Sequence, residues 1–355
     1  MLQPPPPSMQ ALLLTGHGGP EQLVYAVVPT PAPAPGEVLV RLYGAAVNNT
    51  DINLRVGWYS KSVTGSTATT PAAEPTSADA GWAGNALSFP RIQGADGAGT
   101  IAGVGPGVDP ARLGERVLID PILRDGDAAR YFGSDTPGAF AQYTTVPTAN
   151  AVRITTTWND AEIASFPCSY LAALHLVTRA RVSRGQRVLI TGGSGGVGTA
   201  AVQWALARGA SVVAVADPSK TSALRALGVT EVIGRDTDPA AHYGADAFDV
   251  VLDVVGGAMF SALLTVLRPG GQYATAGAIA GPVVALDLRT LYLKDLTLHG
   301  CTIPPAPLFG QLVAAIEDGT LQPLVAATYP LHALAAAQEA FLRKQHVGKM
   351  VLTIP

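Results

Sequence analysis

Two different patterns of apolar and polar positions divide the chain. Before residue 154, short apolar and β-branched runs are separated by Gly and Pro turns, and helical periodicity is scarce. The pattern predicts a β-rich first domain. Its clearest strand candidates are Gln10–Leu14, Leu23–Val28, Glu37–Gly44, Arg116–Ile119 and Gln142–Val146.

From Asp160 onward, apolar strand candidates alternate with helical stretches. Continuous apolar strands separated by helices are typical of a parallel sheet that is covered on both faces. The strand candidates are Arg187–Thr191, Ser211–Ala216, Phe248–Val254 and Gln272–Thr275. The helix candidates are Val197–Ala207, Lys220–Leu227 and Met259–Leu267, followed by Leu308–Asp318 and Leu331–Leu342, and Lys349–Ile354 closes the chain as a strand. The fold class is therefore α/β.

Residues 61–87 fit neither pattern. This stretch is rich in Ser, Thr, Ala and Gly, has almost no charge and shows no period. Two interpretations remain open. It is either a disordered surface insertion or a cover over an active-site cleft, with Trp58 and Trp82 as apolar anchors, because long loops in compact domains are often functional.

Composition narrows the class of protein. A chain of 355 residues predicts two domains, since single cores stop growing near about 250–300 residues. The net charge of −3 and the lack of a Lys/Arg run argue against nucleic-acid binding. No apolar run reaches the roughly 18 residues of a membrane span, and the N-terminal segment does not resemble a signal peptide. Two cysteines are too few for a disulfide framework, so we expect a reducing, cytoplasmic location.

A glycine-dense turn lies between the strand Arg187–Thr191 and the helix Val197–Ala207. Gly193, Gly195 and Gly198 have the spacing G-x-G-x-x-G, which permits a tight turn, a close approach of backbone amides to a pyrophosphate, and close helix–strand packing. The helix N-terminus adds unpaired N–H groups. The turn therefore predicts dinucleotide binding. The candidate contacts are Ser194, Gly195, Gly196 and Val197.

Several motifs, taken in order, resemble the medium-chain dehydrogenase/reductase superfamily and its zinc-free quinone-oxidoreductase-like (zeta-crystallin-like) branch. They include Val47-Asn-Asn-Thr-Asp51, Gln93-Gly-Ala-Asp-Gly-Ala-Gly99, the glycine turn, Leu267-Arg-Pro-Gly-Gly271 and Gly348-Lys349. The resemblance implies a GroES-like catalytic domain formed by residues 1–153 and 305–355, and a Rossmann NAD(P)-binding domain formed by residues 154–304. It also implies a homodimer that pairs through Leu296–Cys301.

The same resemblance bears on metal binding. Where zinc members have a cysteine, a His-Glu pair and a further ligand, this chain has Asn48, Ala95-Asp96 and Cys168. A catalytic zinc needs three protein ligands, so we expect no metal. Cys168 is interpreted as a buried thiol near the cleft, with a reactive thiol as the alternative.

The cofactor type depends on the stretch about 20 positions after the glycines. Asp217 there favours NAD, because a carboxylate accepts hydrogen bonds from the ribose hydroxyls and repels a 2′-phosphate. Ser219 and Lys220 favour NADP instead, because a hydroxyl and a cation would hold that phosphate. We favour NADP, with NAD possible. Asp217 and Ser219 would otherwise only cap the next helix. The resemblance implies that the nicotinamide is contacted by Gly277, Ala278 and Ile279, and that Lys349 also contacts the cofactor. The chain departs from the family at Ala172, where the family often has a threonine.

The reaction implied is hydride transfer to quinones, enones or other α,β-unsaturated carbonyl and enoyl substrates. Without zinc, charge on the substrate oxygen must be stabilised by hydrogen bonds. The resemblance assigns this role to Asn48, an orienting or proton-relay role to Asp51, and a proton-donor or wall role to Tyr59. Asn48 and Asp51 are otherwise turn residues. Alternatives in function are a redox-neutral isomerase or cyclase, a nucleotide-binding structural protein of the lens type, and single-stranded nucleic-acid binding.

Overall fold

The first half of the molecule is built on a twisted, mostly antiparallel sheet. The computed structural model describes residues 4–69, 79–126 and 128–355. The main sheet has the order β10-β6-β5-β3-β18-β17, and β9 also pairs with β3. The bounds are β3 Glu37–Ala46, β5 Asp96–Val104, β6 Arg116–Ile119, β9 Tyr143–Pro147, β10 Ala151–Arg153, β17 Val325–Pro330 and β18 Lys349–Thr353.

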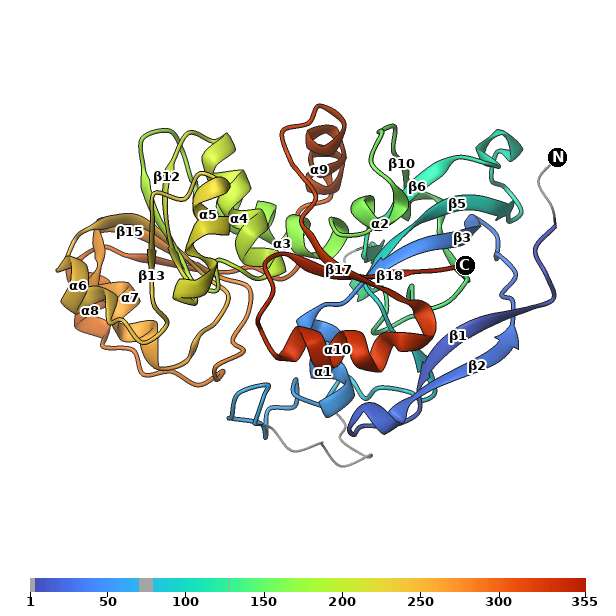
Figure 1. Cartoon of the computed structure of the whole chain (residues 1–355), viewed down its shortest axis with the longest axis horizontal. Coiled ribbons are helices and arrows are strands. Elements are labelled where there is room, and N and C mark those ends of the chain that lie inside the picture. Colours follow the sequence, from blue (N-terminus) through green and yellow to red (C-terminus); the bar gives the residue numbers. More distant parts are fainter. Residues whose placement is uncertain (1–3, 70–78, 127) are drawn as a thin grey trace.

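Two smaller sheets flank it. One has the order β2-β1-β4, and the other is the hairpin β7-β8. The bounds are β1 Ser8–Leu14, β2 Leu23–Pro29, β4 Arg91–Ile92, β7 Ile122–Asp125 and β8 Ala128–Tyr131. Both chain termini lie in this half of the molecule (Figure 1). The hairpin is absent from the sequence expectations, because its strands are four residues each and both contain charged residues.

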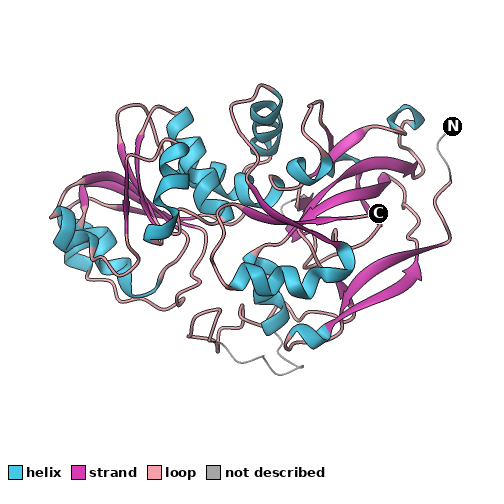
Figure 2. Cartoon of the chain, viewed as in Figure 1, coloured by secondary structure: helices cyan, strands magenta, loops and turns pink. Residues whose placement is uncertain are grey.

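The second half is a parallel sheet of the order β13-β12-β11-β14-β15-β16, as expected for a Rossmann domain. Helices cover both faces (Figure 2). The strands are β11 Arg187–Ile190, β12 Ser211–Val215, β13 Glu231–Ile233, β14 Phe248–Asp253, β15 Leu267–Thr275 and β16 Thr297–Gly300. The helices are α4 Gly196–Ala207, α5 Thr221–Ala226, α6 Pro239–Tyr243, α7 Phe260–Thr265 and α8 Leu288–Leu293.

Helices between the two halves join them into one body. α3 packs on α4 and α9, and its apolar side belongs to a core cluster that extends from Leu118 of β6 to Ile190 of β11. The bounds are α2 Asp160–Ile163, α3 Pro167–Arg179, α9 Pro307–Glu317 and α10 Leu334–Leu342. After α9 the chain returns to the first sheet through β17 and β18 (Figure 1).

One helix of the first half has no counterpart in the expectations. α1, Asn49–Val56, begins at Asn48, whose backbone N–H donates to Oδ2 of Asp51 at 2.8 Å, the contact by which an N3 carboxylate closes a capping box. Gly57 ends the helix in the left-handed region at φ 71°. Among the described residues, no helix has both the length and the apolar character needed to cross a membrane.

Candidate active site

The glycine turn between β11 and α4 has room for a ligand at one glycine and none at another. A Cβ at Gly198 would lie 2.1 Å from the carbonyl oxygen of Gly192, so a side chain there would collide with backbone. At Gly195 the nearest atom to a built Cβ is 3.5 Å away. Gly195 is the N-cap of α4, so the open side of the turn carries the helix's free N–H groups. These contacts fit a pyrophosphate cradle.

The turn also touches the first half of the molecule. A Cβ at Gly196 would lie 2.7 Å from Cδ of Lys349 and 2.8 Å from Oγ of Ser169. The backbone N–H of Gly348 donates to the carbonyl of Ser194 at 3.0 Å. The start of β18 therefore lies directly against the predicted phosphate cradle, and Ser194, Gly196 and Lys349 lie together.

The tip of β12 carries a cluster of cations. Lys220 is 6% exposed, and its Nζ donates to Oγ of Ser194 at 3.2 Å and to the carbonyl of Lys344 at 2.5 Å. The charge of Arg235 acts on both Lys220 and Lys344, and the charge of Asp217 acts on Lys220 in the opposite sense. Burial, then the charges of Lys220 and Arg235, lower the pKa of Lys344 to about 8. No salt bridge to these three cations occurs among the described residues.

Asp217 is engaged by its own neighbour. Its Oδ1 accepts from the backbone N–H of Ser219 at 3.0 Å and from the Ser219 hydroxyl at 2.6 Å. These hydrogen bonds lower the pKa of the Asp217 carboxyl. The geometry is that of a cap, as the sequence allowed. The cap commits one carboxylate oxygen and the Ser219 hydroxyl to each other.

The loop after β15 bears the other predicted cofactor contacts. A pocket of about 220 Å³ lies at the carboxyl end of β15, lined in part by Gly256, Thr275, Gly277 and Ala278. Ile279 accepts a hydrogen bond at its carbonyl from Thr67 N–H, at 3.0 Å.

The loop after β14 that packs beside it is held by a buried carboxylate. Asp253 is fully buried, and it accepts hydrogen bonds from the Thr191 hydroxyl at 2.5 Å and the Tyr273 hydroxyl at 2.6 Å. Asp253 also accepts from the N–H groups of Val255 and Gly256. These bonds fix the backbone against which the Gly277 loop packs.

A second group of side chains gathers four segments around one ammonium. Lys349, 2% exposed, donates from Nζ to Oδ1 of Asn48 at 2.5 Å, Oδ2 of Asp96 at 2.9 Å and Oγ of Ser169 at 3.1 Å. An ammonium has three hydrogens, so all three are used. Asn48 in turn donates from Nδ2 to Asp96 Oδ2 at 2.7 Å and to the Ala46 carbonyl at 3.3 Å. Both amide hydrogens of Asn48 are thus engaged within the protein.

Asp51 and Tyr59 flank this group. Asp51 is 1% exposed, and burial is the largest cause that raises the pKa of its carboxyl to about 7. The Tyr59 hydroxyl donates to Oγ1 of Thr50 at 3.3 Å, and burial raises the pKa of Tyr59 to about 12. The charges of Asp51 and Cys168 act on Tyr59, which places the three together.

Cys168 belongs to the same group. Its backbone N–H donates to Oδ1 of Asp96 at 2.6 Å, and its Sγ lies 2.9 Å from the hydroxyl of Tyr131. Burial, then the charge of Asp96, raises the pKa of the Cys168 thiol to about 12. Burial likewise raises the pKa of Tyr131. Both groups therefore remain protonated at neutral pH.

This donor set does not fit a catalytic zinc. An amide oxygen and a carboxylate oxygen stand at the positions of a cysteine and a His-Glu pair, and both already accept from the Lys349 ammonium. The thiol of Cys168 has a raised pKa, whereas zinc binds a thiolate. Among the described residues, no three His, Cys, Asp or Glu side chains are grouped to hold a metal.

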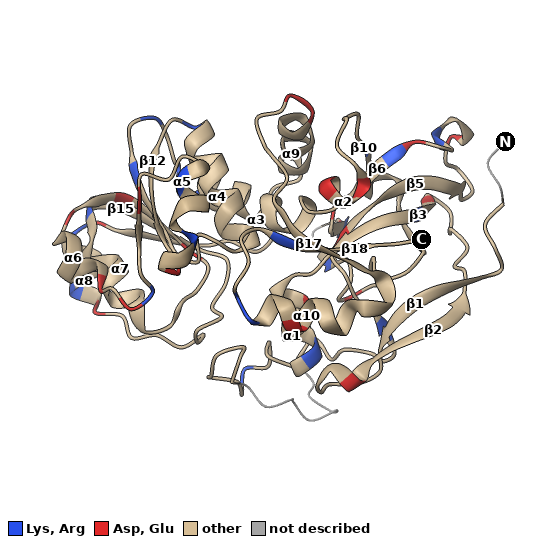
Figure 3. Cartoon of the chain, in the orientation of Figure 1, with Lys and Arg blue, Asp and Glu red and all other residues tan. Residues whose placement is uncertain are grey.

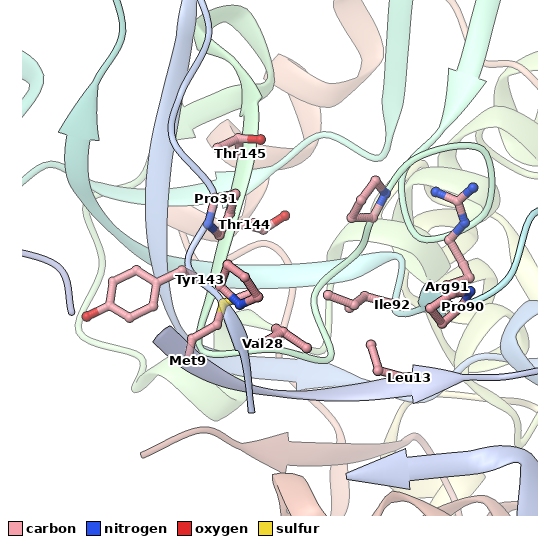
Figure 4. A pocket seen from close by; sticks show the side chains of 12 residues that line it. Met9, Leu13, Val28, Pro31, Pro90, Arg91, Ile92, Tyr143, Thr144 and Thr145 are labelled. Carbon is pink, nitrogen blue, oxygen red and sulfur yellow. The ribbon is translucent and has the colours of Figure 1, made fainter. Parts of the chain in front are cut away.

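A further pocket lies away from this site. It has a volume of about 250 Å³ and lies between β1, β4 and β9, where Met9, Leu13, Val28, Ile92 and Tyr143 are among its lining residues (Figure 4). None of the predicted site residues lines it. It has no part in the candidate chemistry.

Sequence reasoning left several of these residues without a role. Asp96 was noted only as a replaced metal position, and Ser169 only as part of a helix start. No sequence pattern indicated a role for Lys344, Arg235 or Tyr131, because their partners come from distant segments. Charged residues are sparse and scattered over both halves (Figure 3), so pattern alone does not reveal which cations meet.

Two family models match the chain. Residues 34–156 match the alcohol dehydrogenase GroES-like domain, and residues 196–318 match the zinc-binding dehydrogenase model. Among solved structures, a putative alcohol dehydrogenase from Sinorhizobium meliloti 1021 is 43% identical with a TM-score of 0.88, covering 99% of this chain and 98% of that one. A cobalt- and zinc-bound thermostable alcohol dehydrogenase from Pyrobaculum aerophilum is 30% identical with a TM-score of 0.82, covering 98% and 99%.

Curated relatives include parts of much longer proteins. The spectinabilin polyketide synthase system protein NorB of Streptomyces orinoci is 30% identical over 370 residues, which is all of this chain but 15% of NorB. The chain spans 5% of the polyketide synthase GfsB of Streptomyces halstedii. The acryloyl-coenzyme A reductase of Metallosphaera sedula is 27% identical, covering 97% of this chain and 100% of that protein.

The GroES-like model matches strands of the first sheet, and the zinc-binding dehydrogenase model begins at α4 and covers five strands of the parallel sheet. A relative of 43% identity matches nearly the full length of both chains. This chain belongs to the medium-chain dehydrogenase/reductase superfamily of oxidoreductases.

Proposed function

We propose that this chain is a zinc-independent, NADPH-dependent reductase that transfers hydride to quinones, enones or other α,β-unsaturated carbonyl or enoyl substrates. The observation that carries the proposal is a pair of contacts made by one buried ammonium. Lys349 Nζ donates to both Asn48 and Asp96, which stand where zinc-binding family members have metal ligands. A site without a Lewis acid is better suited to conjugated acceptors than to simple alcohols. Hydride then adds to carbon, and the negative charge is delocalised onto a more distant oxygen.

The cofactor preference rests on the cations at the tip of β12. Lys220, Arg235 and Lys344 form a positive cluster, and Asp217, the acid whose charge acts on Lys220, is capped by Ser219. A 2′-phosphate brings about two negative charges to such a cluster, whereas NADH brings none there. This supports NADPH. The Ser194–Val197 turn and the Gly277–Ile279 loop would hold the pyrophosphate and nicotinamide ends.

When bound, the nicotinamide supplies the hydride, and the chain's own residues must manage charge and protons. The carboxyl of Asp51, with its pKa near 7, holds a proton that it can exchange at neutral pH. Tyr59 and Tyr131 remain neutral donors beside Cys168. The Asn48 amide can donate to the substrate oxygen only if it breaks its hydrogen bond to Asp96 or to the Ala46 carbonyl. The bond to Ala46, at 3.3 Å, is the longer and weaker of the two, so it is the one that breaks.

One relative supports a conjugated acceptor. The name of the Metallosphaera sedula protein states reduction of acryloyl-coenzyme A, a conjugated thioester. The test is the oxidation of NADPH, followed by absorbance, with menadione, open-chain and aryl enones, and crotonyl-coenzyme A. We expect turnover with NADPH at least tenfold above NADH in kcat/KM, unchanged by a strong chelator. NADPH binding without oxidation across this panel, or activity lost on chelation and restored by zinc, would overturn the proposal.

We also propose a homodimer formed along β16. This strand is the edge of the parallel sheet. Large apolar side chains are exposed around it: Val283 at 70%, Leu288 at 63%, Tyr292 at 61%, Leu293 at 71% and Ile303 at 48%. An unpaired edge beside a concentrated apolar surface is what a second copy would cover.

A further inference from the structure

The insertion after α1 returns to the candidate site in its first described part. Thr67 is 6% exposed, and its hydroxyl donates to Oδ1 of Asn53 at 3.0 Å while its N–H donates to the carbonyl of Ile279 at 3.0 Å. Trp58 donates from Nε1 to the carbonyl of Gly65, also at 3.0 Å. Residues 61–69 therefore tie α1 to the loop that holds the predicted nicotinamide contacts. Residues 70–78 lie outside the described part of the insertion.

The second described part, residues 79–87, brings an aromatic ring to the site. Its start is fixed by Asp79, whose Oδ2 accepts from the N–H of Lys61 at 2.8 Å. Trp82 then stacks on Tyr131, with ring centroids 4.5 Å apart and planes at 21°. Because the Tyr131 hydroxyl lies 2.9 Å from Sγ of Cys168, the indole is one side chain away from Cys168, whose backbone N–H donates to Asp96.

Trp82 and Tyr59 form one lining. Both pack against the small apolar cluster of Leu14, Leu54 and Leu87. Both are half-buried. The rings that they contact are nearly covered: Trp58, which meets Tyr59 edge to face, is 9% exposed, and Tyr131, which stacks on Trp82, is 6% exposed. Of these four aromatic side chains, Trp82 and Tyr59 therefore keep the larger exposed fractions.

Among the described residues that form it, the lining offers no positive charge to a substrate. Lys349 and Asp96 pair with each other, the thiol and phenols stay protonated, and Asp51, whose charge acts on Tyr59, is neutral or negative. A negatively charged substrate group placed against these rings would lose water without gaining an opposite charge, which is costly. A flat, uncharged ring would instead stack on the indole.

We propose that Trp82 is a specificity-determining residue, and that its indole selects flat, uncharged, ring-bearing enones and quinones over open-chain enones and coenzyme A thioesters. This inference rests on the proposed reductase function. Aromatic stacking beyond simple burial is worth roughly a two- to tenfold preference. The selecting side chain comes from the insertion and not from the glycine turn or the metal-ligand positions.

The test compares kcat/KM for benzylideneacetone, which carries a ring, with kcat/KM for open-chain ethylideneacetone. We expect the wild type to prefer the ring-bearing enone. Trp82→Ala should lower that preference roughly two- to tenfold, through KM, with ethylideneacetone little changed. Trp82→Phe should retain most of the preference. Trp158→Phe is the matched control, since Trp158 is also half-buried but its backbone hydrogen-bonds to Arg116 and Thr156, outside the lining.

Two results would overturn the inference. One is an unchanged preference in a folded Trp82→Ala protein that still oxidises NADPH, and the other is a wild type that prefers ethylideneacetone or crotonyl-coenzyme A. If the wild type reduces none of these compounds, the proposed function fails, and dialysis with menadione in the presence of NADP⁺ still tests Trp82. A dissociation constant unchanged by Trp82→Ala would then overturn the inference, and a rise of a few-fold would support it.

Discussion

Lys349 and Asp96, which are 253 positions apart in the sequence, form an ion pair of 2.9 Å at the centre of the candidate site, with Lys349 2% and Asp96 0% exposed. One residue opens β18 near the C-terminus, and the other opens β5 in the GroES-like half. The pairing also places Lys349 against Gly196 of the glycine turn. The last strand therefore completes both the first sheet and the site.

Removal of the ammonium alone should destabilise the protein strongly. Lys349→Met leaves the buried Asp96 carboxylate without its partner, a change that typically costs about 3–5 kcal/mol. The double variant Lys349→Met/Asp96→Asn removes both charges and should recover most of that loss. Urea unfolding measures both. Arg289→Met, in an exposed pair with Asp287, should leave the stability almost unchanged, because solvent screens exposed ion pairs. A double variant as unstable as the single one would contradict this account.

Lys344 should control the affinity for NADPH but not for NADH. A charge-assisted contact to phosphate is worth about 1.5–3 kcal/mol, so Lys344→Met should raise the KM for NADPH roughly tenfold or more. The pKa of Lys344 is about 8, so its charge is present below that pH and lost above it. The wild-type KM for NADPH should therefore rise as pH passes 8, and this rise should be absent in Lys344→Met. The neighbouring exposed Arg343, changed to Met, is the control.

Much of the fold was predictable because its signals are local. The strand–glycine–helix order at Gly193–Gly198 and the alternating apolar strands after it predicted the parallel sheet and its strands β11, β12, β14 and β15, but the three-residue β13 and the short helices α6 and α8 were missed. α1 was missed, since the segment from Asn48 to Asp51 is polar and its helix is stabilised by a cap and by tertiary contacts instead of by an apolar stripe. The β7-β8 hairpin was missed for lack of length.

The site was predictable only where the resemblance pointed to it. Asn48, Asp51 and Tyr59 do lie together, but the arrangement of their partners could not be read from the sequence. Lys349 meets Asp96, and Lys220 meets Lys344, only because distant segments fold side by side. A capped Asp217 is a matter of side-chain geometry that spacing does not determine.

Disruption of the apolar surface around β16 should give monomers. Leu288→Asp/Leu293→Asp places two charges where side chains that are 63% and 71% exposed are proposed to meet a second copy. Light scattering coupled to size exclusion should report a dimer for the wild type and a monomer for the variant. Val27→Asp, on β2 and 69% exposed, should leave the dimer intact. A monomeric wild type at micromolar concentration would contradict the proposed interface.

Cys168 should behave as an inert thiol in the native protein. Its pKa of about 12 leaves a very small thiolate fraction at pH 8, and Cys301, with a pKa of about 11, is also buried. The thiolate is the nucleophile, so alkylation by iodoacetamide should be at least about 100-fold slower than for the same protein in urea. Mass spectrometry of the labelled peptides separates the two cysteines. Rapid native labelling of Cys168 would favour the reactive-thiol alternative.

The titration of Asp51 should make the free energy of unfolding decrease between about pH 4 and pH 7. Its carboxyl has a pKa of about 7 in the folded state, against about 3.9 in an unfolded chain. Between these values the folded state keeps a proton that the unfolded state has released, so the free energy of unfolding falls as pH rises. The full shift corresponds to about 4 kcal/mol at most, lost once pH exceeds the folded pKa.

The comparison that isolates this effect is the change of stability with pH in Asp51→Asn relative to wild type. An asparagine cannot titrate, so the variant should become relatively more stable as pH rises from 4.5 to 7.5, on the order of 2–4 kcal/mol. Its amide also faces the N–H of Asn48, which adds an offset that does not depend on pH. Asp125→Asn, at an exposed site in the β7-β8 hairpin, should follow the wild-type curve. Parallel curves for wild type and Asp51→Asn would show that Asp51 is ionised in the folded state throughout this range, and its role as a proton carrier at neutral pH would fail with it.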